Sequence, residues 1–359
     1  MSTPGTENLL EAYERLHAFG PEYGGDEEGN HGMTNHGPMA VEVMVRRGLD
    51  INVDHWLDRY VRRLSELPSP DVTIRPDQWR TALGVAGRLP SWTTFFRREL
   101  QERPWSDALV EWWPRLLPGI VAGSTHGVIR VGHAVRTLRA NPDVPPAPET
   151  LDELAHGLAF WAARYRELSG VVAPDGQLSA AEALSGVTRL DDQNGLIAHR
   201  LDRLERSRGW TSSLRAMRPA TSPDEVPARL ESLIDTAVAA YLGHGHSSPV
   251  LLVHTATAPN AVRHVLPVLP TEQWARSLTA AWAASAALVA TYASAKPTPR
   301  TDVVGGHDGT AAEALQRAAE HGDEHVLKFA DTAVEAYDRT GDRDLLAATG
   351  RARELIPTP

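Results

Sequence analysis

Apolar residues recur three and four positions apart along most of the chain, which is the spacing of a helix that buries one face. Runs in which apolar and polar residues alternate, typical of half-buried strands, are few. The pattern therefore predicts an all-α protein. Helices are expected over residues 7–19, 35–45, 53–67, 90–103, 107–117, 124–139, 149–168, 179–184, 194–206, 223–242, 248–266, 271–294 and 310–337.

The helix that begins at Asn35 is apolar nearly all round, so it is predicted to be central. The Gly- and Glu-rich segment 20–31 before it predicts a loop. The most linker-like segments, 141–148 and 296–309, are too short to force separate domains, and no repeat period is found. We expect one compact multi-helix domain over residues 1–359, with buried central helices around an internal cavity for a metal and a substrate.

Composition and charge exclude several classes of function. The chain of 359 residues contains no cysteine, which excludes disulfides, thiolate nucleophiles, iron–sulfur clusters and cysteine–zinc sites and suits a reducing, cytoplasmic location. A formal net charge of -10 argues against nucleic acid as a partner. The N-terminal residues lack the basic and apolar regions of an export signal, and no apolar run predicts a membrane span. The expected partner is a small molecule.

Four of the 15 histidines lie in or beside helices too apolar to be surface helices: His36, His126, His254 and His325. His126, Arg130 and His133 follow an i, i+4, i+7 spacing and therefore share one helix face, which is expected to line the cavity. His325 follows Gly322 and Asp323, a helix end and a new N-cap, which places it in a first turn. Only two of the 36 basic residues are lysines, and Lys328 lies three positions after His325.

Each histidine alone is best interpreted as a core residue bonded to a carbonyl group. Four imidazoles and a lysine on separate buried helices favour convergence on one metal, because each buried polar group left unpaired costs roughly 1–3 kcal/mol. Imidazoles without cysteine suit iron, zinc, copper or nickel, and a carboxylate-like anion favours iron or manganese.

Familiar catalytic motifs are absent from the sequence, including His-Glu-x-x-His, Gly-x-Gly-x-x-Gly, the Walker loop and Gly-x-Ser-x-Gly. The doublet His307-Asp308 is flanked by glycines, which predicts a loop and not the helical site of a metal phosphohydrolase. His244-Gly245-His246 is interpreted as a turn, since no acidic residue accompanies it.

At these residues the sequence resembles the questin oxidase-like family. The shared features occur in order along most of the chain: Asn35-His36-x-Pro38-Met39-Ala40, His126-Gly127-x-Ile129-Arg130-x-x-His133-Ala134-Val135-Arg136, His254-Thr255-x-Thr257 and Asp323-Glu324-His325-Val326-x-Lys328. The resemblance implies oxygen chemistry on aromatic polyketides, namely oxidative opening of anthraquinone rings or a Baeyer–Villiger-type oxygen insertion. Gly37 departs from the larger apolar residue expected there, which would widen the substrate pocket.

The resemblance also implies that iron is held by four histidines and a carboxylated lysine. Matched one motif at a time, these ligands are His36, His126, His254, His325 and Lys328. His126 is preferred to His133 because it fits the His-Gly pair, which leaves His133 and Arg130 either to hold the metal ligands in place or to act on the substrate. NADPH is expected only as an external reductant, because the chain has no nucleotide-binding motif.

Physical chemistry supports the role of Lys328 independently of the resemblance. Addition of carbon dioxide requires a neutral amine, and burial among Val326, Leu327 and Phe329 disfavours a charged one. The alternative interpretation is a snorkelling lysine paired with Glu324 one turn earlier.

The sequence thus predicts a non-haem iron oxygenase, either a monooxygenase or a dioxygenase, in which Trp112, Trp113 or Trp282 packs against an electron-rich substrate. Two other functions fit the same residues. One is a metal-free helical protein that binds an apolar ligand, with Arg130 gripping an acid. The other is a metal-dependent hydrolase.

Overall fold

The computed structural model describes residues 4–22, 34–303 and 309–359. Within these ranges it contains seventeen α-helices and two short strands, so the prediction of an all-α protein is confirmed. The chain divides into two compact units, Met1–Glu167 and Leu168–Pro359.

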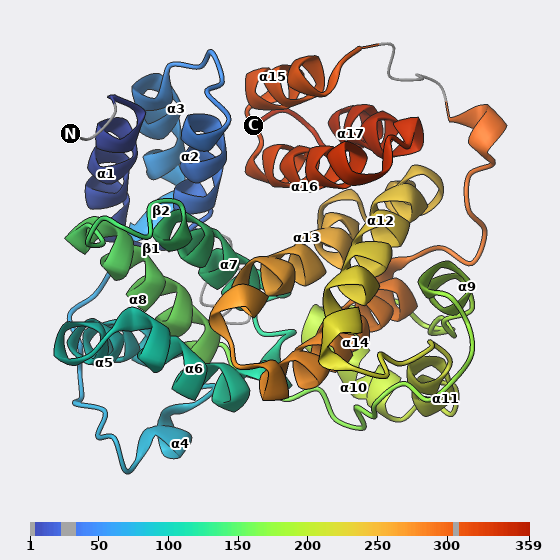
Figure 1. Ribbon diagram of the computed structural model, residues 1–359, viewed down its shortest axis with the longest axis horizontal. Coiled ribbons are helices and arrows are strands. Elements are labelled where there is room, and N and C mark those ends of the chain that lie inside the picture. The colour runs from blue at the N-terminus through green and yellow to red at the C-terminus, as the bar shows by residue number, and fades with distance from the viewer. Residues whose placement is uncertain (1–3, 23–33, 304–308) are drawn as a thin grey trace. The chain divides into compact units, whose positions relative to one another are not determined.

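The first unit holds α1 to α8 and a two-stranded antiparallel sheet (Figure 1). Its elements are α1 (Pro4–His17), β1 (Phe19–Glu22), α2 (Gly37–Arg46), α3 (Val53–Tyr60), β2 (Leu64–Glu66), α4 (Trp79–Ala82), α5 (Leu89–Glu102), α6 (Trp105–Leu116), α7 (His126–Arg139) and α8 (Pro148–Ala163).

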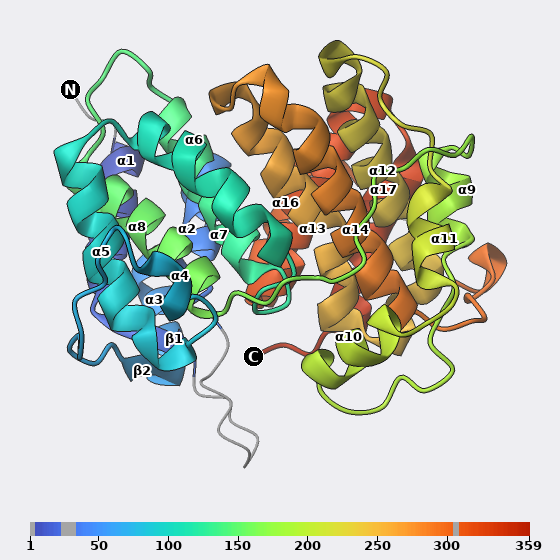
Figure 2. The same ribbon diagram turned by 90° about the horizontal axis from the view of Figure 1, so that it is seen from below.

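The second unit holds α9 to α17, whose longer members run side by side (Figure 2). Its elements are α9 (Ala180–Ser185), α10 (Ile197–Glu205), α11 (Trp210–Arg215), α12 (Val226–His244), α13 (Pro249–Val265), α14 (Trp274–Tyr292), α15 (Ala311–His321), α16 (Glu324–Thr340) and α17 (Arg343–Leu355).

In the first unit, α8 is the helix around which others pack, since α1, α5 and α7 all lie against it. The contact between α7 and α8 is close because both helices contribute a glycine. A Cβ atom on Gly127 would lie 2.6 Å from the Cβ of Trp161, and one on Gly157 would lie 3.2 Å from a methyl group of Val131. The glycine of the His126-Gly127 pair thus serves helix packing.

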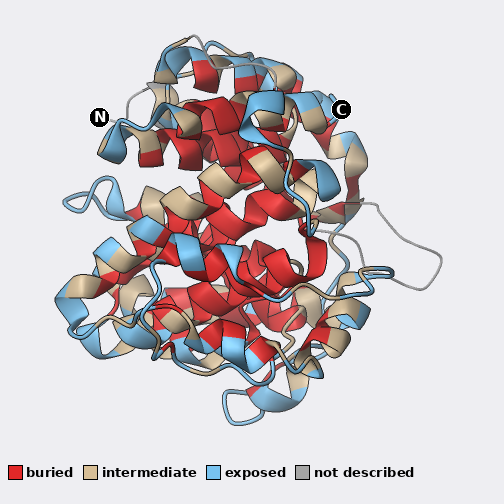
Figure 3. Ribbon diagram, turned by 90° about the vertical axis from the view of Figure 1, so that its right-hand side faces the viewer, coloured by how far each residue is buried: buried red, intermediate tan, exposed pale blue. Residues whose placement is uncertain are grey.

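The helix that is apolar nearly all round, α2, is buried from Gly37 to Met44, as predicted. It lies against α1 on one side and α7 on another. In the second unit α14 has the same character, with every residue from Ala280 to Tyr292 buried. In Figure 3 long runs of helix are red, and hence buried, whereas many of the loops are exposed.

In the first unit, one predicted helix and one predicted loop were wrong. The helix expected over 53–67 ends at Tyr60, and Leu64–Glu66 forms β2 instead. Its partner β1 occupies the start of the segment predicted as a loop, with Phe19 opposite Glu66 and Glu22 opposite Leu64. Such short strands carry little periodic signal, and their pairing depends on contacts between residues more than forty positions apart.

The single helix expected over 310–337 is two helices. Gly322 adopts a left-handed conformation (φ 87°) that ends α15, and Asp323 caps α16 by accepting from the backbone N–H groups of His325 and Val326. The same Gly–Asp combination recurs at Gly341 and Asp342, where it separates α16 from α17. The signal for α17 was therefore present in the sequence. Among the helices that the structure describes, none combines the length and apolar character needed to cross a bilayer.

The contact between α7 and α8 makes a testable prediction. Replacing Gly127 by Ala places a methyl group inside the van der Waals radius of Trp161, and overpacking of this kind costs about 1–3 kcal/mol. A lower thermal midpoint is therefore expected for Gly127→Ala. Gly87→Ala is the control, because a Cβ atom there meets nothing within 4 Å. Equal midpoints for the two variants would contradict the close packing.

Candidate metal centre and a second histidine cluster

His36 and His126 face one another in the first unit. His36 is the residue that precedes α2, and His126 is the first residue of α7. Their Nε2 atoms lie 2.8 Å apart, and the two rings meet edge to face at an interplanar angle of 80°. Both side chains are buried.

The other nitrogen of each ring is held by an oxygen atom. His36 Nδ1 lies 2.7 Å from Glu22 Oε1, and His126 Nδ1 lies 2.5 Å from the carbonyl oxygen of Gly123. When both Nδ1 atoms donate, both Nε2 atoms direct lone pairs at the space between them. Metal-binding histidines have this arrangement, with the second ring nitrogen bonded to a carboxylate or carbonyl group.

The separation also fits a metal. Two nitrogens bound at right angles to one ion at about 2.1 Å lie about 3 Å apart. A proton on one Nε2 would instead make the contact a hydrogen bond. The pair formed by His36 and His126 can therefore hold a proton or a metal ion.

A strained turn places His126. Gly123, Ser124 and Thr125 all have positive φ angles, of 51°, 58° and 70°. A non-glycine residue in this region costs of order 1–3 kcal/mol, and such strain concentrates at functional sites. The turn brings the carbonyl group of Gly123 back to the ring of His126.

Asn35 and Gly37 explain the rest of the motif around His36. The Asn35 side chain donates to the backbone oxygen of Leu16 and accepts from the backbone N–H of Gly37, which fixes the start of α2 against α1. A Cβ atom on Gly37 would lie 2.7 Å from Leu16 and 2.8 Å from Tyr60. The expectation that Gly37 widens a pocket is therefore wrong, because Leu16 and Tyr60 fill that space.

The polar residues of α7 have separate partners. Arg130 binds Glu153 through two hydrogen bonds of 2.6 and 2.7 Å. His133 Nδ1 lies 2.9 Å from Glu42, which also binds Arg136. Burial alone would raise the pKa of Glu42, but Arg136 and His133 lower it to about 2. Only His126 of the three predicted residues faces another candidate ligand within this unit.

The second unit brings His254 and His325 together. His254 lies within α13 and His325 in the first turn of α16, as predicted, and their ring centroids are 5.4 Å apart. Both are buried, and α13 packs against α16. Asp323 fixes the first turn that carries His325.

Lys328 lies one turn further along α16. Its relative exposure is 1%, and the neighbouring Val326, Leu327 and Phe329 are also buried. A snorkelling lysine keeps its ammonium group in water. The snorkelling part of that interpretation is therefore wrong, because the whole side chain is enclosed. The pairing with Glu324 stays a prediction.

The three candidate substrate aromatics lie in the cores of their units. Trp112 packs among Trp92, Phe95 and Phe96, and Trp113 packs against Trp161. The indole of Trp282 donates to the carbonyl group of Leu214. Their contact with a substrate stays a prediction.

His244 ends α12, and the exposed His246 lies 3.1 Å from the hydroxyl group of Thr298. His307 and Asp308 lie outside the described residues.

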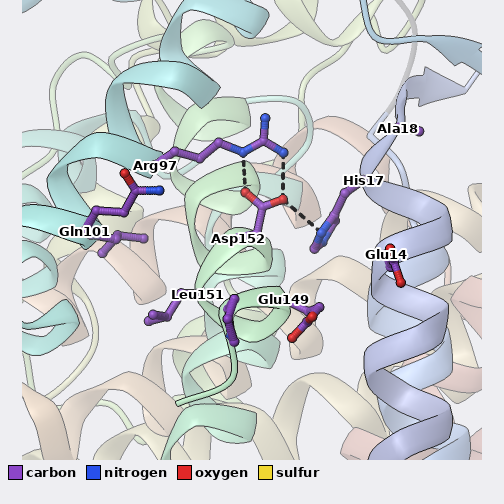
Figure 4. Close-up of a pocket in the computed structure, with 10 residues that line it drawn as sticks. Glu14, His17, Ala18, Arg97, Gln101, Glu149, Leu151 and Asp152 are labelled. Carbon is purple, nitrogen blue, oxygen red and sulfur yellow. Dashed lines mark hydrogen bonds and ion pairs between the residues drawn. The ribbon is translucent and has the colours of Figure 1, made fainter. Parts of the chain in front are cut away.

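A second histidine cluster was not predicted. It lies at a pocket of about 1010 Å³ in the first unit, lined by His17, Arg97 and Asp152 among others. Figure 4 shows the carboxylate of Asp152 between the guanidinium group of Arg97 and the ring of His17. His156 stacks on His17, with ring centroids 4.7 Å apart.

The geometry sets the charges in this cluster. His17 lies 3.0 Å from Asp152 through Nδ1 and 3.0 Å from Glu153 through Nε2, and only a protonated ring can donate from both nitrogens. Burial opposes that charge, yet the two carboxylates raise the pKa of His17. Burial, with His17 and Arg130 nearby, holds the pKa of His156 well below its usual value.

His17, Asp152 and His156 are residue types that bind metals, and their ligand atoms lie within 4.8 Å of one another. The Arg97 guanidinium, however, lies against both Asp152 and His156, so it already supplies the cation. The sequence could have indicated His156 as a candidate, because it precedes a glycine in an apolar helix, as His126 does.

Comparison with known proteins adds one finding. A family model described as questin oxidase-like matches residues 52–333, which cover most of both units. The match includes His126, His254, His325 and Lys328, whereas His36 precedes it. None of the curated proteins compared with the chain matches it.

The doubly bonded His17 predicts a pH-dependent stability. Because the folded state raises its pKa above 6.5, its stabilising effect is complete below that pH and is lost as the pH rises through the raised value. At about pH 6 the wild type should exceed His17→Gln in free energy of unfolding by about 1.5–3 kcal/mol, the range for hydrogen bonds to charged groups.

Urea unfolding at a series of pH values measures this difference, which should shrink towards alkaline pH. His246→Gln, at an exposed position, should match the wild type throughout. A difference that grows with pH would show that His17 is not held as an imidazolium.

Proposed function

The chain belongs to the questin oxidase-like family, and on that premise we propose that it is a non-haem iron oxygenase acting on an aromatic polyketide of the anthraquinone or hydroquinone type. Membership of the family indicates an oxidoreductase that uses dioxygen and a small-molecule substrate. The observation that carries the proposal of a metal is the facing pair of His36 and His126, each tied at Nδ1 to an oxygen atom.

We assign one iron site to five residues: His36, His126, His254, His325 and Lys328. Support comes from within each unit, since the first brings two of the histidines together and the second brings the other two together. Imidazole nitrogens with one oxygen anion form a donor set that suits ferrous iron.

Lys328 would supply the anion as a carbamate. A neutral Nζ attacks carbon dioxide to form an N–C bond, and loss of a proton from nitrogen leaves a carbamate with two oxygen atoms. The enclosed, apolar surroundings of Lys328 favour the neutral amine that this addition requires. Charge balance with a metal would then keep the modification in place.

Arg130 and His133 are assigned to the substrate. Glu153 holds Nε and Nη2 of Arg130, which fixes the plane of the guanidinium group, and the third nitrogen, Nη1, is the atom that would donate to a phenolate. Glu42 holds Nδ1 of His133, so its Nε2 is the atom that would hold a substrate proton.

Iron, when bound, supplies the activation of dioxygen. The enclosed side chains around the histidines exclude water, which protects a reactive centre from side reactions. The overall reaction is proposed to be oxidative ring opening or a Baeyer–Villiger-type insertion, with NADPH acting only as an external reductant.

Lys328→Ala tests the carbamate. The variant should lose most of its iron after desalting and all detectable oxygen consumption with a reduced anthraquinone, because one anionic ligand is gone, while its helix content stays near that of the wild type. Added formate or acetate should restore a small part of the activity. The matched control is Lys296→Ala, which removes the other lysine from an exposed position.

Iron retention and rate equal to wild type in Lys328→Ala would contradict the assignment of Lys328. A wild-type protein that binds no iron under anaerobic loading would favour the metal-free binding protein. Turnover under strict anoxia would favour the hydrolase.

The choice of His126 over His133 makes a separate prediction. His126→Ala and His254→Ala should each lower bound iron at least tenfold, since each removes a ligand, whereas His133→Ala should keep its iron and lose rate. His244→Ala and His307→Ala should resemble the wild type in both measurements. Loss of iron from His133→Ala together with its retention in His126→Ala would reverse the assignment.

A further inference from the structure

We propose that Glu22 is a positioning residue for the metal centre, which sets the tautomer, the orientation and the donor strength of His36. The inference rests on the proposed function, because it concerns the same metal site. It goes beyond that function by giving a role to a carboxylate in a segment where the sequence predicted only a loop.

Glu22 contacts His36 at close range and out of water. Its Oε1 lies 2.7 Å from His36 Nδ1, and the side chains of Glu22 and His36 are 2% and 0% exposed. A carboxylate can only accept a hydrogen bond, so it selects the tautomer with hydrogen on Nδ1. That tautomer leaves the lone pair on Nε2, which faces His126.

Glu22 is itself held by two further groups. The hydroxyl group of Tyr60 donates to Oε1 over 2.6 Å, and Arg63 Nη2 lies 3.1 Å from Oε2. Tyr60 Oη also accepts from the backbone N–H of His36 at 2.5 Å. The ring and the backbone of His36 are therefore fixed through the same carboxylate and tyrosine.

Three separate elements build this arrangement. Glu22 ends β1, where it pairs with Leu64 of β2, and Tyr60 ends α3 just before that strand. The small sheet therefore has a positional role, because it holds Glu22 beside the start of α2.

The two imidazoles receive unequal support. His126 donates to a neutral carbonyl group, whereas His36 donates to an anion. An anionic acceptor increases the basicity of the opposite ring nitrogen more than a neutral one does, and mutation of such acceptors typically weakens metal binding 10- to 100-fold. His36 should therefore be the stronger donor of the pair.

The test measures Co²⁺ binding to the full-length apo-protein by its visible absorption, without substrate and without air. Glu22→Gln keeps the shape of the side chain but removes its charge, and should weaken Co²⁺ binding about 10- to 100-fold. Glu22→Asp keeps the charge but places the carboxylate farther from His36, so its Co²⁺ affinity should lie between those of the wild type and Glu22→Gln. The absorption band of bound Co²⁺ should also shift in Glu22→Gln, since a purely structural role would leave the spectrum of the bound ion unchanged.

Asp152→Asn is the matched control. Asp152 is a partly buried carboxylate in the same unit that binds a histidine and an arginine, but its histidine is not a proposed ligand. Asp152→Asn should lower the thermal midpoint while leaving Co²⁺ affinity within about twofold of the wild type. If Glu22→Gln fails to fold, the imidazole ¹H–¹⁵N spectra of apo wild type and apo Glu22→Asp provide the test. The Nδ1–H proton of His36 should be strongly deshielded in the wild type and less deshielded in Glu22→Asp. An ordinary chemical shift in the wild type would overturn the role of Glu22.

The outcomes separate the two proposals. Co²⁺ binding of equal strength in wild type, Glu22→Gln and Asp152→Asn overturns the role of Glu22 and leaves the proposed function standing. Equal weakening in Glu22→Gln and Asp152→Asn also overturns it, because the effect would then be general destabilisation. A wild type that binds no Co²⁺ overturns the proposed function and this inference with it.

Discussion

The contact on which the first unit's chemistry depends is the approach of two buried imidazoles, His36 and His126, through their Nε2 atoms. Neither ring can turn away, because Glu22 holds one at Nδ1 and the carbonyl group of Gly123 holds the other. Two lone pairs that face each other in a buried place require a proton or a cation between them. The strained turn before His126 is consistent with a site built around that requirement.

The first unit compensates its buried charges in a repeated way. Each deeply buried carboxylate that the structure describes in this unit binds a histidine and at least one arginine: Glu22 binds His36 and Arg63, Glu42 binds His133, Arg136 and Arg46, and Glu153 binds His17 and Arg130. Breaking such a pair leaves an uncompensated buried charge, which is strongly destabilising. The arrangement therefore orients the imidazoles rigidly, and only the histidine of Glu22 directs its second nitrogen at another candidate ligand within the unit.

Local features of the chain were predictable, and features that depend on distant contacts were not. The apolar character of α2 and the first-turn position of His325 followed from composition and capping residues. The β1 and β2 strands, the cluster at His17 and the partner of His36 did not, because each is made by residues that are close only in the folded chain. The family resemblance identified His126 through the pair His126-Gly127. In the structure Gly127 is explained by its packing against Trp161.

By itself, the sequence determined that the protein is helical, that it lacks cysteine chemistry, and that several histidines and one lysine occupy apolar helices. These properties depend on composition and on a helical period that extends over a few residues only. The tertiary structure decided which of those side chains meet and which carboxylate holds each one. Helix packing and strand pairing bring together residues as far apart as 36 and 126, and no local spacing in the sequence indicates that contact.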